Sequence, residues 1–441
     1  MYTPMEHLVG QAIGSDTRPL TRAEIETWQI EQLRRQVRYC TGHSFFYRRK
    51  LAAAGVDRVH GLHDLASLPF TTESELRQHG NEMVCVSQNA VARIITLHSS
   101  GTTGPPKRLF FTEADLDHTL NFFHLGMGQM AAPGDRVAIL LPGQTPDSTG
   151  DLLARALARM QTTGIILGLA TDPQAAAQKI SELQPNVLVG FPVQILALVR
   201  IARYLRLPLA PIRSVLLCSD YVPASLTQSL QHELGCEVFS HYGAVETGLG
   251  GAVDCSAHCG CHVCETNLLV EIVDPNTGMP VADGAWGEIV CTTLTRTGMP
   301  LIRYRTGDLC RLLPGPCPCG SAIRRLDRVL GRIDQVRTLD NGARLSLPDL
   351  DEKLFVISGL LDFTAALKRN GRRIELHLCL TSLPGLKKKV ESLAIGRLCQ
   401  QEWAQDLDIT IEHAEATLVQ PAKRRLEDFR NKNDPYNESK A

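Results

Sequence analysis

The stretch His98-Ser99-Ser100-Gly101-Thr102-Thr103-Gly104-Pro105-Pro106-Lys107 follows an alternating, strand-like run from Val91 to Leu97. Its glycines can turn backbone amides toward an anion, its hydroxyls can donate further hydrogen bonds, and Lys107 adds a positive charge. The spacing is not that of a P-loop, because no Gly-Lys-Ser/Thr opens a helix and Arg108 to Thr112 is predicted to be another strand. This pattern favours a phosphate-binding loop, although a surface loop of turn formers has the same composition.

Outward from this loop, short apolar strands alternate with amphipathic helices as far as Leu217, which predicts an α/β fold with a parallel sheet and helices on both faces. Ligands of such sheets lie beyond the carboxyl ends of the strands, where the Ser99 loop and the segment from His241 are expected. The predicted strands are Arg136–Leu141, Thr163–Leu167, Val187–Gly190 and Ser214–Cys218. The predicted helices are Glu113–Met130, Thr149–Met160, Pro173–Leu183, Pro192–Leu205 and Pro223–Leu234.

The flanking regions have a different texture. Thr21 precedes helical spacing over residues 21–58, and Thr72 is expected to cap a further short helix. After Val238, the predicted strands Leu268–Val273, Gly287–Thr293 and Leu309–Leu313 are separated by turns. Gly331 marks a boundary, and a small α+β part is predicted after it. Its predicted elements are strands at 362–368, 373–379 and 408–413 and a helix at 384–401. We therefore predict a large domain of residues 1–332 and a small mobile lid of residues 333–441. The large domain divides into a helical layer (1–90), a parallel core (91–237) and a β-rich part (238–332).

The bulk composition excludes several classes of protein. Of the 441 residues, 44% are hydrophobic and 21% charged, and the net charge of -1 gives no general attraction to nucleic acid or to anionic membranes. Residues 1–21 lack the apolar core of a signal peptide or anchor, and no later run has membrane-spanning length. A cytoplasmic location is the expectation.

The placement of the cysteines is more informative than their number. Six of the 14 fall in two clusters, 255–264 and 317–319. In a reducing compartment, clustered cysteines with an interleaved histidine favour a metal over a disulfide.

Two later motifs suggest further contacts to a nucleotide. In His241-Tyr242-Gly243-Ala244-Val245-Glu246-Thr247-Gly248, a glutamate just past a strand and a glycine turn can hold Mg²⁺. A solvated Glu246 in a capped turn is the alternative. In the segment 300–309, Asp308 is expected in a turn, where it can accept hydrogen bonds from a ribose diol.

Taken together, these motifs resemble the adenylate-forming superfamily over nearly the whole chain, and within it the phenylacetate-coenzyme A ligase family. Residues 99–104 are similar to its phosphate loop, Tyr242-Gly243 with Glu246 to its magnesium motif, Asp308 to its ribose-binding aspartate, and Gly331-Arg332 to its hinge approach. The runs 46–48, 68–72 and 271–275 are also similar to that branch.

The resemblance implies a two-step reaction with ATP, Mg²⁺ and coenzyme A as cofactors. A carboxylate attacks the α-phosphorus of ATP, pyrophosphate leaves, and coenzyme A takes the acyl group. The catalytic residues that it implies are Lys423, Glu246 and Thr103, with Lys107 also serving the pyrophosphate. The implied cofactor-binding residues are Ser99, Ser100, Gly101, Thr102, Thr103, Gly104, Lys107, Ser219, Asp220, His241, Tyr242, Gly243, Glu246, Thr247, Asp308 and Arg332.

Several positions depart from the family pattern. Ala422 precedes Lys423 where glycine is common, and the spacing to Asp428 is one residue short. Ser219-Asp220 stands where an acidic pair with glycine or alanine is usual near the adenine, and Gln335 replaces a frequent hinge aspartate. These departures leave open a catalytically reduced, zinc-stabilised nucleotide-binding protein. An acyl-adenylating enzyme that uses a carrier protein or a deazaflavin coenzyme as acceptor is a further alternative.

Four ligands fit a closed structural zinc site. Some members of the ligase family have a Cys-x-x-His and a later Cys-x-Cys-Gly, which implies Cys255, His258, Cys317 and Cys319 as the zinc ligands. The resemblance also implies Glu246 as the magnesium ligand. Cys259, Cys261, His262 and Cys264 are rivals. Phenylacetate is the default substrate, with Phe123, Tyr221 and His241 as candidate pocket residues. The expected partners are the acid, ATP and coenzyme A, without nucleic acid or membrane, in a possible homodimer.

Overall fold

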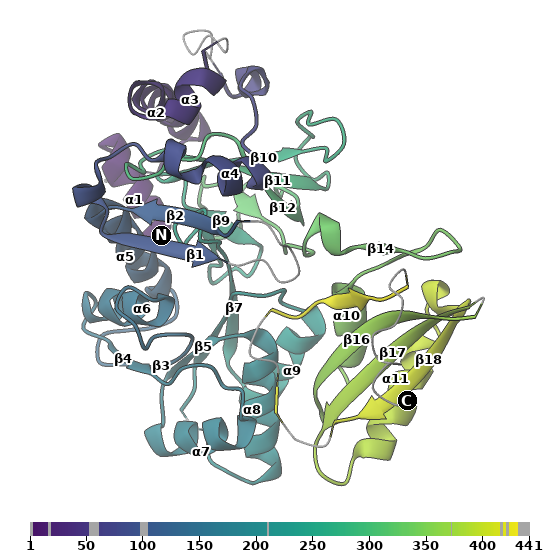
Figure 1. Ribbon diagram of the computed structural model, residues 1–441. Coiled ribbons are helices and arrows are strands. Elements are labelled where there is room, and N and C mark those ends of the chain that lie inside the picture. Colours follow the sequence, from purple (N-terminus) through teal and green to yellow (C-terminus); the bar gives the residue numbers. More distant parts are fainter. Residues whose placement is uncertain are drawn as a thin grey trace. The chain divides into compact units, whose positions relative to one another are not determined.

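The computed structural model describes residues 3–15, 19–52, 61–97, 105–209, 211–371, 373–414, 418–419 and 423–430 (Figure 1). The chain forms two compact units, and each is described by itself. Unit 1 comprises Met1–Gly134, Gly143–Gly164 and Phe239–Leu330, and unit 2 comprises Asp135–Pro142, Ile165–Val238 and Gly331–Ala441. Within the described ranges, no helix is long and apolar enough to cross a membrane.

Unit 1 combines helices with three small sets of strands. Its helices are α1 (Pro4–Ile13), α2 (Arg22–His43), α3 (Phe45–Lys50), α4 (Glu73–Met83), α5 (Glu113–Met127) and α6 (Thr149–Ala158). Its strands are β1 (Arg93–Leu97), β2 (Lys107–Phe111), β8 (Ala252–Val253), β9 (Cys261–Val263), β10 (Leu268–Val273), β11 (Gly287–Thr293), β12 (Tyr304–Cys310) and β13 (Arg325–Leu326). Strand β7 (Glu237–Tyr242) enters unit 1 from Phe239 onward, and β4 (Thr163–Ile166) begins there.

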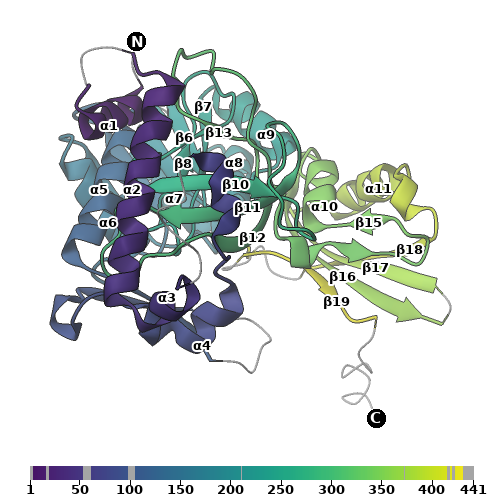
Figure 2. The same ribbon diagram turned by 90° about the horizontal axis from the view of Figure 1, so that it is seen from above.

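Helix α2 begins where the sequence predicts, because Thr21 and Glu24 form a reciprocal capping box. Its buried face carries two glutamines as well as apolar residues. Gln29 donates to the carbonyl of Leu268 at 3.2 Å, and Gln36 donates to the carbonyl of Arg296 at 2.5 Å. Figure 2 shows α2 lying along β10 and β11. These bonds give the buried side-chain amides of α2 backbone acceptors in unit 1.

The antiparallel sheet β10-β11-β12 follows the predicted strands except at its third member. We expected a strand at Leu309–Leu313 with Asp308 in the preceding turn, and this prediction was wrong. Strand β12 runs from Tyr304 to Cys310, so Asp308 lies inside it. Gly307 within this strand has a φ of 76°, and the register with β11 shifts nearby, as at a β-bulge.

Strands β1 and β2 pair antiparallel, with Leu97 opposite Lys107. The Ser99 loop therefore joins two strands of an antiparallel pair, and it does not follow a strand of the parallel sheet as we expected. Strands β7, β8 and β9 continue the antiparallel pairing, and β13 pairs with β9.

Unit 2 contains the predicted parallel core, and its α/β class is confirmed. Strands β3 (Arg136–Leu140), β5 (Val187–Gly190) and β6 (Ser214–Leu217) are parallel neighbours, in the order β4-β3-β5-β6-β7. The connecting helices are α7 (Pro173–Leu183), α8 (Pro192–Tyr204) and α9 (Ala224–Leu234). Every residue of α8 from Pro192 to Ala202 is buried, which agrees with a sequence in that stretch that is apolar except for Gln194 and Arg200.

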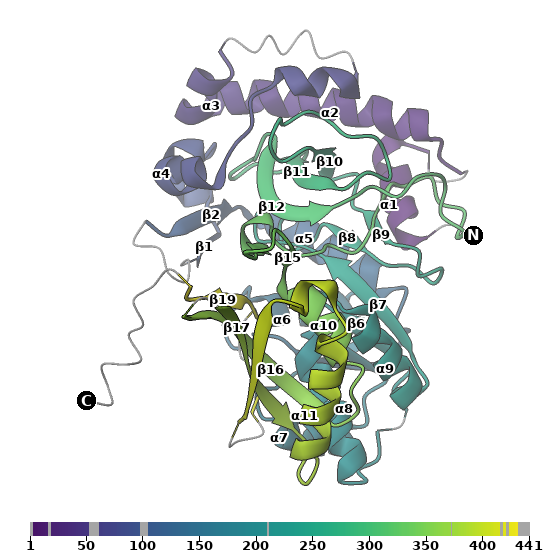
Figure 3. The same cartoon turned by 90° about the vertical axis from the view of Figure 1, so that its right-hand side faces the viewer.

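The C-terminal part of unit 2 is built on a four-stranded sheet in the order β18-β17-β16-β19. Figure 3 shows α11 lying over this sheet. The elements of this C-terminal part are β14 (Arg337–Thr338), β15 (Arg344–Leu345), α10 (Leu347–Leu354), β16 (Leu360–Asn370), β17 (Arg373–Ser382), α11 (Lys387–Leu398), β18 (Leu407–His413) and β19 (Leu426–Asp428).

One hydrophobic core within unit 2 includes residues of the parallel strands and of this C-terminal part. The buried Arg200 of α8 adds polar contacts, since it donates to the carbonyls of Phe355 at 2.7 Å, Ile357 at 3.0 Å and Leu360. These carbonyls follow α10 and lead into β16, whose first residue is Leu360. The division into domains at residue 332 stays a prediction.

Candidate active site and metal site

The predicted phosphate loop can be placed only by its flanks. Strand β1 ends at Leu97 and β2 begins at Lys107. The candidate residues Ser99, Ser100, Gly101, Thr102, Thr103 and Gly104 lie outside the described residues.

Lys107 and Glu246 form a buried ion pair in unit 1, with side chains that are 7% and 10% exposed. The ammonium of Lys107 also lies 3.8 Å from Oε1 of Glu73. Tyr304 donates its hydroxyl hydrogen to Oε1 of Glu246 at 3.1 Å, and Arg296 donates to the Glu246 carbonyl at 2.9 Å. Both ends of Glu246 are thus fixed, and Lys107 faces this carboxylate directly.

The charge state of Glu246 follows from two opposing effects. Burial alone would raise the pKa of its carboxyl, but the ammonium of Lys107 outweighs burial, and the hydroxyl of Tyr304 adds to the lowering. The pKa therefore lies below its ordinary value, and the residue is a carboxylate at neutral pH. A preformed, ionised carboxylate can hold a hard cation.

Tyr242 and Asp308, which the sequence places 66 residues apart, meet in unit 1. The Tyr242 hydroxyl donates to Oδ2 of Asp308 at 2.9 Å, and the amide of Asp308 donates to Oγ1 of Thr306 at 3.1 Å. Burial, with the Asp308 charge, raises the pKa of Tyr242 well above its ordinary value, so the phenol stays a donor. This contact brings the predicted ribose residue to the motif that carries Glu246.

The turn between Tyr242 and Glu246 is tightly packed. A Cβ on Gly243 would lie 2.5 Å from the Leu249 carbonyl oxygen and 2.6 Å from Cε1 of His241, so only glycine fits. Thr247 closes the turn by accepting a hydrogen bond from the Ala244 amide at 3.0 Å. Burial lowers the pKa of His241 to about 4, which makes its ring neutral, and the ring centroid lies 5.7 Å from that of Phe122.

The remaining nucleotide candidates belong to unit 2. Ser219 has a φ of 72°, and the Asp220 carboxylate accepts from the Tyr221 amide at 2.9 Å. Tyr221 donates to Glu352 at 2.7 Å. Arg332 pairs with the exposed Asp334 at 3.3 Å, and Lys423 is exposed.

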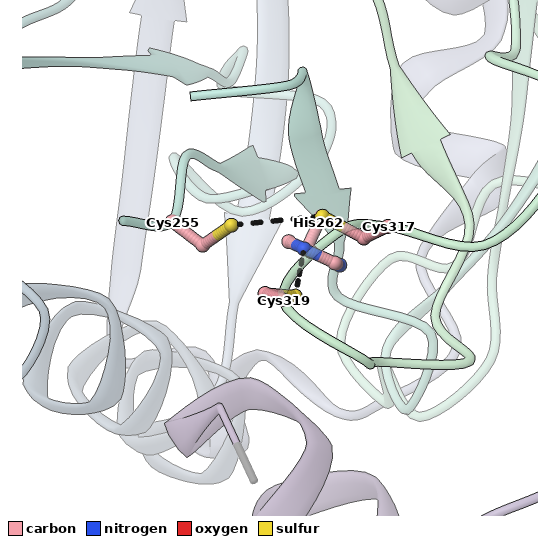
Figure 4. Close-up of side chains that lie close together, drawn as sticks. All are labelled: Cys255, His262, Cys317 and Cys319. Carbon is pink, nitrogen blue, oxygen red and sulfur yellow. Dashed lines mark hydrogen bonds between the residues drawn. The ribbon is translucent and has the colours of Figure 1, made fainter. Parts of the chain in front are cut away.

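A second site in unit 1 collects sulfur and nitrogen. Cys255 follows β8, His262 lies in β9, and Cys317 and Cys319 come from the segment between β12 and β13. Figure 4 shows their side chains converging. Their donor atoms all lie within 4.8 Å of one another, with Cys255 Sγ and Cys317 Sγ 3.8 Å apart and Cys319 Sγ and His262 Nε2 3.4 Å apart.

These distances fit one tetrahedral metal ion. With a Zn–S distance of about 2.3 Å, two thiolates on a tetrahedron stand about 3.8 Å apart. Burial lowers the pKa of His262 to about 4, so its ring is a neutral ligand, and burial raises the pKa of Cys255 above its ordinary value. A metal would have to displace the Cys255 proton on binding.

The histidine in this cluster is His262, and not the expected His258. Nδ1 of His258 lies 2.9 Å from the Asp254 carboxylate, and its ring packs on Phe239 with centroids 4.8 Å apart. The strand register explains the difference. Strands β8 and β9 pair with Val253 opposite His262, and Val253 stands two residues before Cys255. The spacing Cys-x-x-His cannot reveal that pairing. Of the other rivals, Cys261 donates to the Ser240 carbonyl and Cys264 contacts Thr266.

A family model for AMP-binding enzymes matches residues 27–295 of this chain. The chain belongs to the AMP-binding enzyme family. The phenylacetate-coenzyme A ligase of Thermus thermophilus is 30% identical over 423 residues, which cover 93% of this chain and 91% of that protein. The phenylacetate-coenzyme A ligase of Escherichia coli is 30% identical over 340 residues, 75% of this chain and 76% of its own. The predicted branch of the family is confirmed.

The fold of this AMP-binding enzyme also matches a solved structure. A 2-hydroxyisobutyryl-CoA ligase in the postadenylation state with 2-HIB-AMP gives a TM-score of 0.81 at 20% identity, covering 96% of this chain and 93% of the other. This likeness supports the fold alone.

The sequence did not predict three residues that organise the candidate sites of this AMP-binding enzyme. Tyr304 and Arg296 fix Glu246, and Arg424 is buried beside Lys423. The only signal for Tyr304 was its place in the segment that ends at Asp308. Arg296 and Arg424 carry no motif signal, since neither a single arginine nor one in the basic run Lys423-Arg424-Arg425 indicates that its side chain is buried.

Proposed function

We propose that this AMP-binding enzyme activates an aromatic acid of the phenylacetate type in two steps. A carboxylate oxygen of the acid attacks the α-phosphorus of ATP, which forms the acyl adenylate and releases pyrophosphate. The sulfur of coenzyme A then attacks the acyl carbon, which forms the thioester and releases AMP. The relatives of 30% identity that span most of the chain support this reaction.

The observation that carries the proposal is the hydrogen bond that brings Asp308 to Tyr242, four residues before Glu246. Glu246 would hold Mg²⁺ beside the phosphates, with Lys107 and Tyr304 keeping its carboxylate ionised and fixed. Mg²⁺ neutralises charge that develops on the phosphate oxygens. Asp308 would accept hydrogen bonds from the ribose hydroxyls while Tyr242 fixes its carboxylate.

The other residues have supporting roles in the proposal. The hydroxyls and amides of the loop 99–104 would bind the pyrophosphate part of ATP, Ser219 and Asp220 would lie beside the adenine, and Lys423 would complete the adenylation site. Most of this work is positioning and charge stabilisation, which needs no general base, because the acid is already ionised at neutral pH. The cytoplasmic location and the homodimer stay predictions.

We infer that Cys255, His262, Cys317 and Cys319 hold a structural Zn²⁺. Four protein ligands leave the ion no open position, so it would stabilise the β-rich part of unit 1 and take no part in the reaction.

The test of the function is AMP formation with a panel of aromatic and aliphatic acids, each with and without coenzyme A. We expect phenylacetate and related acids to give AMP together with the thioester when coenzyme A is present. AMP without thioester would point to another acceptor, and no AMP from any acid would reject the proposal.

A further inference from the structure

Arg424, the residue after Lys423, is a buried cation whose side chain is 6% exposed. Its Nη1 donates to Oδ1 of Asp351 at 2.7 Å, its Nη2 donates to the Phe363 carbonyl at 3.1 Å, and its Nε lies 3.1 Å from Oδ1 of Asp362. Asp351 belongs to α10, and Asp362 belongs to β16. A single guanidinium therefore joins two elements of unit 2.

The surroundings of Arg424 require its shape as well as its charge. The guanidinium lies 4.3 Å from the ring centroid of Phe363 and 5.1 Å from that of Phe355. A planar guanidinium stacks flat on aromatic rings and donates through a rigid fork of five N–H groups, whereas a lysine ammonium is a compact point charge with three donors and no planar face. The Asp351 and Asp362 side chains are each 3% exposed, so removing Arg424 would take from two buried carboxyl groups the cation that they share.

The backbone around Arg424 is also held. Its amide donates to Oδ2 of Asp220 at 3.4 Å, and Leu426, two residues on, is 1% exposed and begins β19, which pairs with Ala365 of β16. Lys423 is exposed, and its charge acts on Asp220. Since consecutive Cα atoms are about 3.8 Å apart, fixing residues 424 and 426 restricts where the Lys423 ammonium can reach.

We propose that Arg424 is a positioning residue for adenylation, which anchors the Lys423 segment to α10 and β16 while Asp220 holds its backbone. This inference rests on the proposed role of Lys423. A misplacement of about 1 Å in a reacting group can cost about 100-fold in rate, so the loss of this anchor affects the step that uses Lys423.

The experiment separates the two half-reactions of the full-length enzyme. Adenylation is followed by pyrophosphate–ATP exchange with phenylacetate, and thioester formation is followed from preformed phenylacetyl adenylate with coenzyme A. The variants are Arg424→Met and Arg424→Lys, beside Lys423→Ala. Arg425→Met is the matched control, because Arg425 is 41% exposed and pairs with Glu427.

We expect Arg424→Met to lower kcat of exchange by about 100-fold with little change in KM for ATP, and to keep thioester formation within about threefold. Arg424→Lys restores part of the exchange rate by keeping the charge, and Arg425→Met behaves like the parent. A thermal unfolding scan identifies a misfolded Arg424→Met, and in that case Arg424→Lys decides, with a selective loss of exchange as the expected result.

Parental exchange in a folded Arg424→Met, or an equal loss of both half-reactions in the folded variants, overturns the inference. Lys423→Ala separates this failure from that of the proposed function. If Lys423→Ala loses exchange and Arg424→Met does not, only the positioning role fails. If Lys423→Ala exchanges normally, the assignment of Lys423 fails, and the positioning role fails with it.

Discussion

The ammonium of Lys107 is paired with the carboxylate of Glu246, 139 residues further along the chain, and both side chains are buried. A lysine expected to bind phosphate thus also holds the carboxylate expected to bind magnesium. Its removal leaves Glu246 as a buried charge with fewer donors, and this contact leads to the first two predictions.

Lys107→Met should lower the free energy of unfolding by about 3–5 kcal/mol, because breaking a buried ion pair from one side leaves the other charge uncompensated. Urea unfolding followed by tryptophan fluorescence measures this change. Lys179→Met is the control, because Lys179 is 54% exposed and its pair with Glu182 should contribute at most about 1 kcal/mol. A similarly small loss of unfolding free energy in Lys107→Met would contradict the buried ion pair between Lys107 and Glu246.

Glu246→Gln should lower the rate of adenylation by about 100-fold or more, because the amide keeps the shape but loses the charge that would hold Mg²⁺. Pyrophosphate release measured over a series of Mg²⁺ concentrations checks this, with a higher Mg²⁺ requirement expected in the variant. Glu31→Gln, at a side chain 56% exposed, should match the parent. An unchanged Mg²⁺ requirement in Glu246→Gln would remove that residue from the metal site.

Gly243→Ala should impair both stability and activity, because the added Cβ would overlap the Leu249 carbonyl and the His241 ring. Overpacking of this kind costs about 1–3 kcal/mol. Gly42→Ala, inside α2 with open space around its Cβ position, should instead stabilise by about 0.5–1 kcal/mol. Equal behaviour of the two variants would argue against the tight turn.

His262→Gln and the double variant Cys317→Ser/Cys319→Ser should lose bound zinc, and His258→Gln should keep it. The reason is that His262 Nε2 lies among the sulfur atoms, whereas His258 faces Asp254. Plasma emission spectrometry of the purified proteins gives the zinc content per chain. Retention of zinc in His262→Gln with loss in His258→Gln would restore the ligand set expected from the sequence.

Asp351 should make stability depend on pH. Burial raises the pKa of its carboxyl to about 7 in spite of Arg424, above an unfolded value of about 3.9. Because the folded state binds this proton more tightly, the contribution to stability is complete below about pH 3.9 and is lost as the pH rises to about 7. Relative to the parent, Asp351→Asn should therefore lose less stability between pH 4 and pH 7.

Urea midpoints measured at several pH values in that range test this difference. Asp340→Asn, at an exposed aspartate paired with Arg369, should follow the parent at every pH. If the urea midpoints of the parent and of Asp351→Asn changed in parallel with pH, burial would not raise the pKa of the Asp351 carboxyl.

The sequence predicted most elements of the fold because their signals are local. The strand Val187–Gly190 and the helix Pro173–Leu183 have the predicted bounds, since apolar runs and helix-capping residues mark them. Asp308 was expected in a turn because the glycine before it, Gly307, is typical of turns. In the structure Gly307 has a positive φ but lies inside a strand. Similarly, His262 replaced His258 because the pairing of β8 with β9 is a non-local property. The roles of Lys423, Asp220 and Arg332 stay predictions.

The three carbonyls that Arg200 caps have a consequence for protein engineering. They tie the end of α10 to a helix of the parallel core, and a common apolar interior surrounds them. Exchanging the C-terminal hundred or so residues with those of a homologue would graft in a foreign α10, whose carbonyls need not meet this guanidinium. A working hybrid would therefore have to transplant Arg200 and its helix together with the new C-terminal segment.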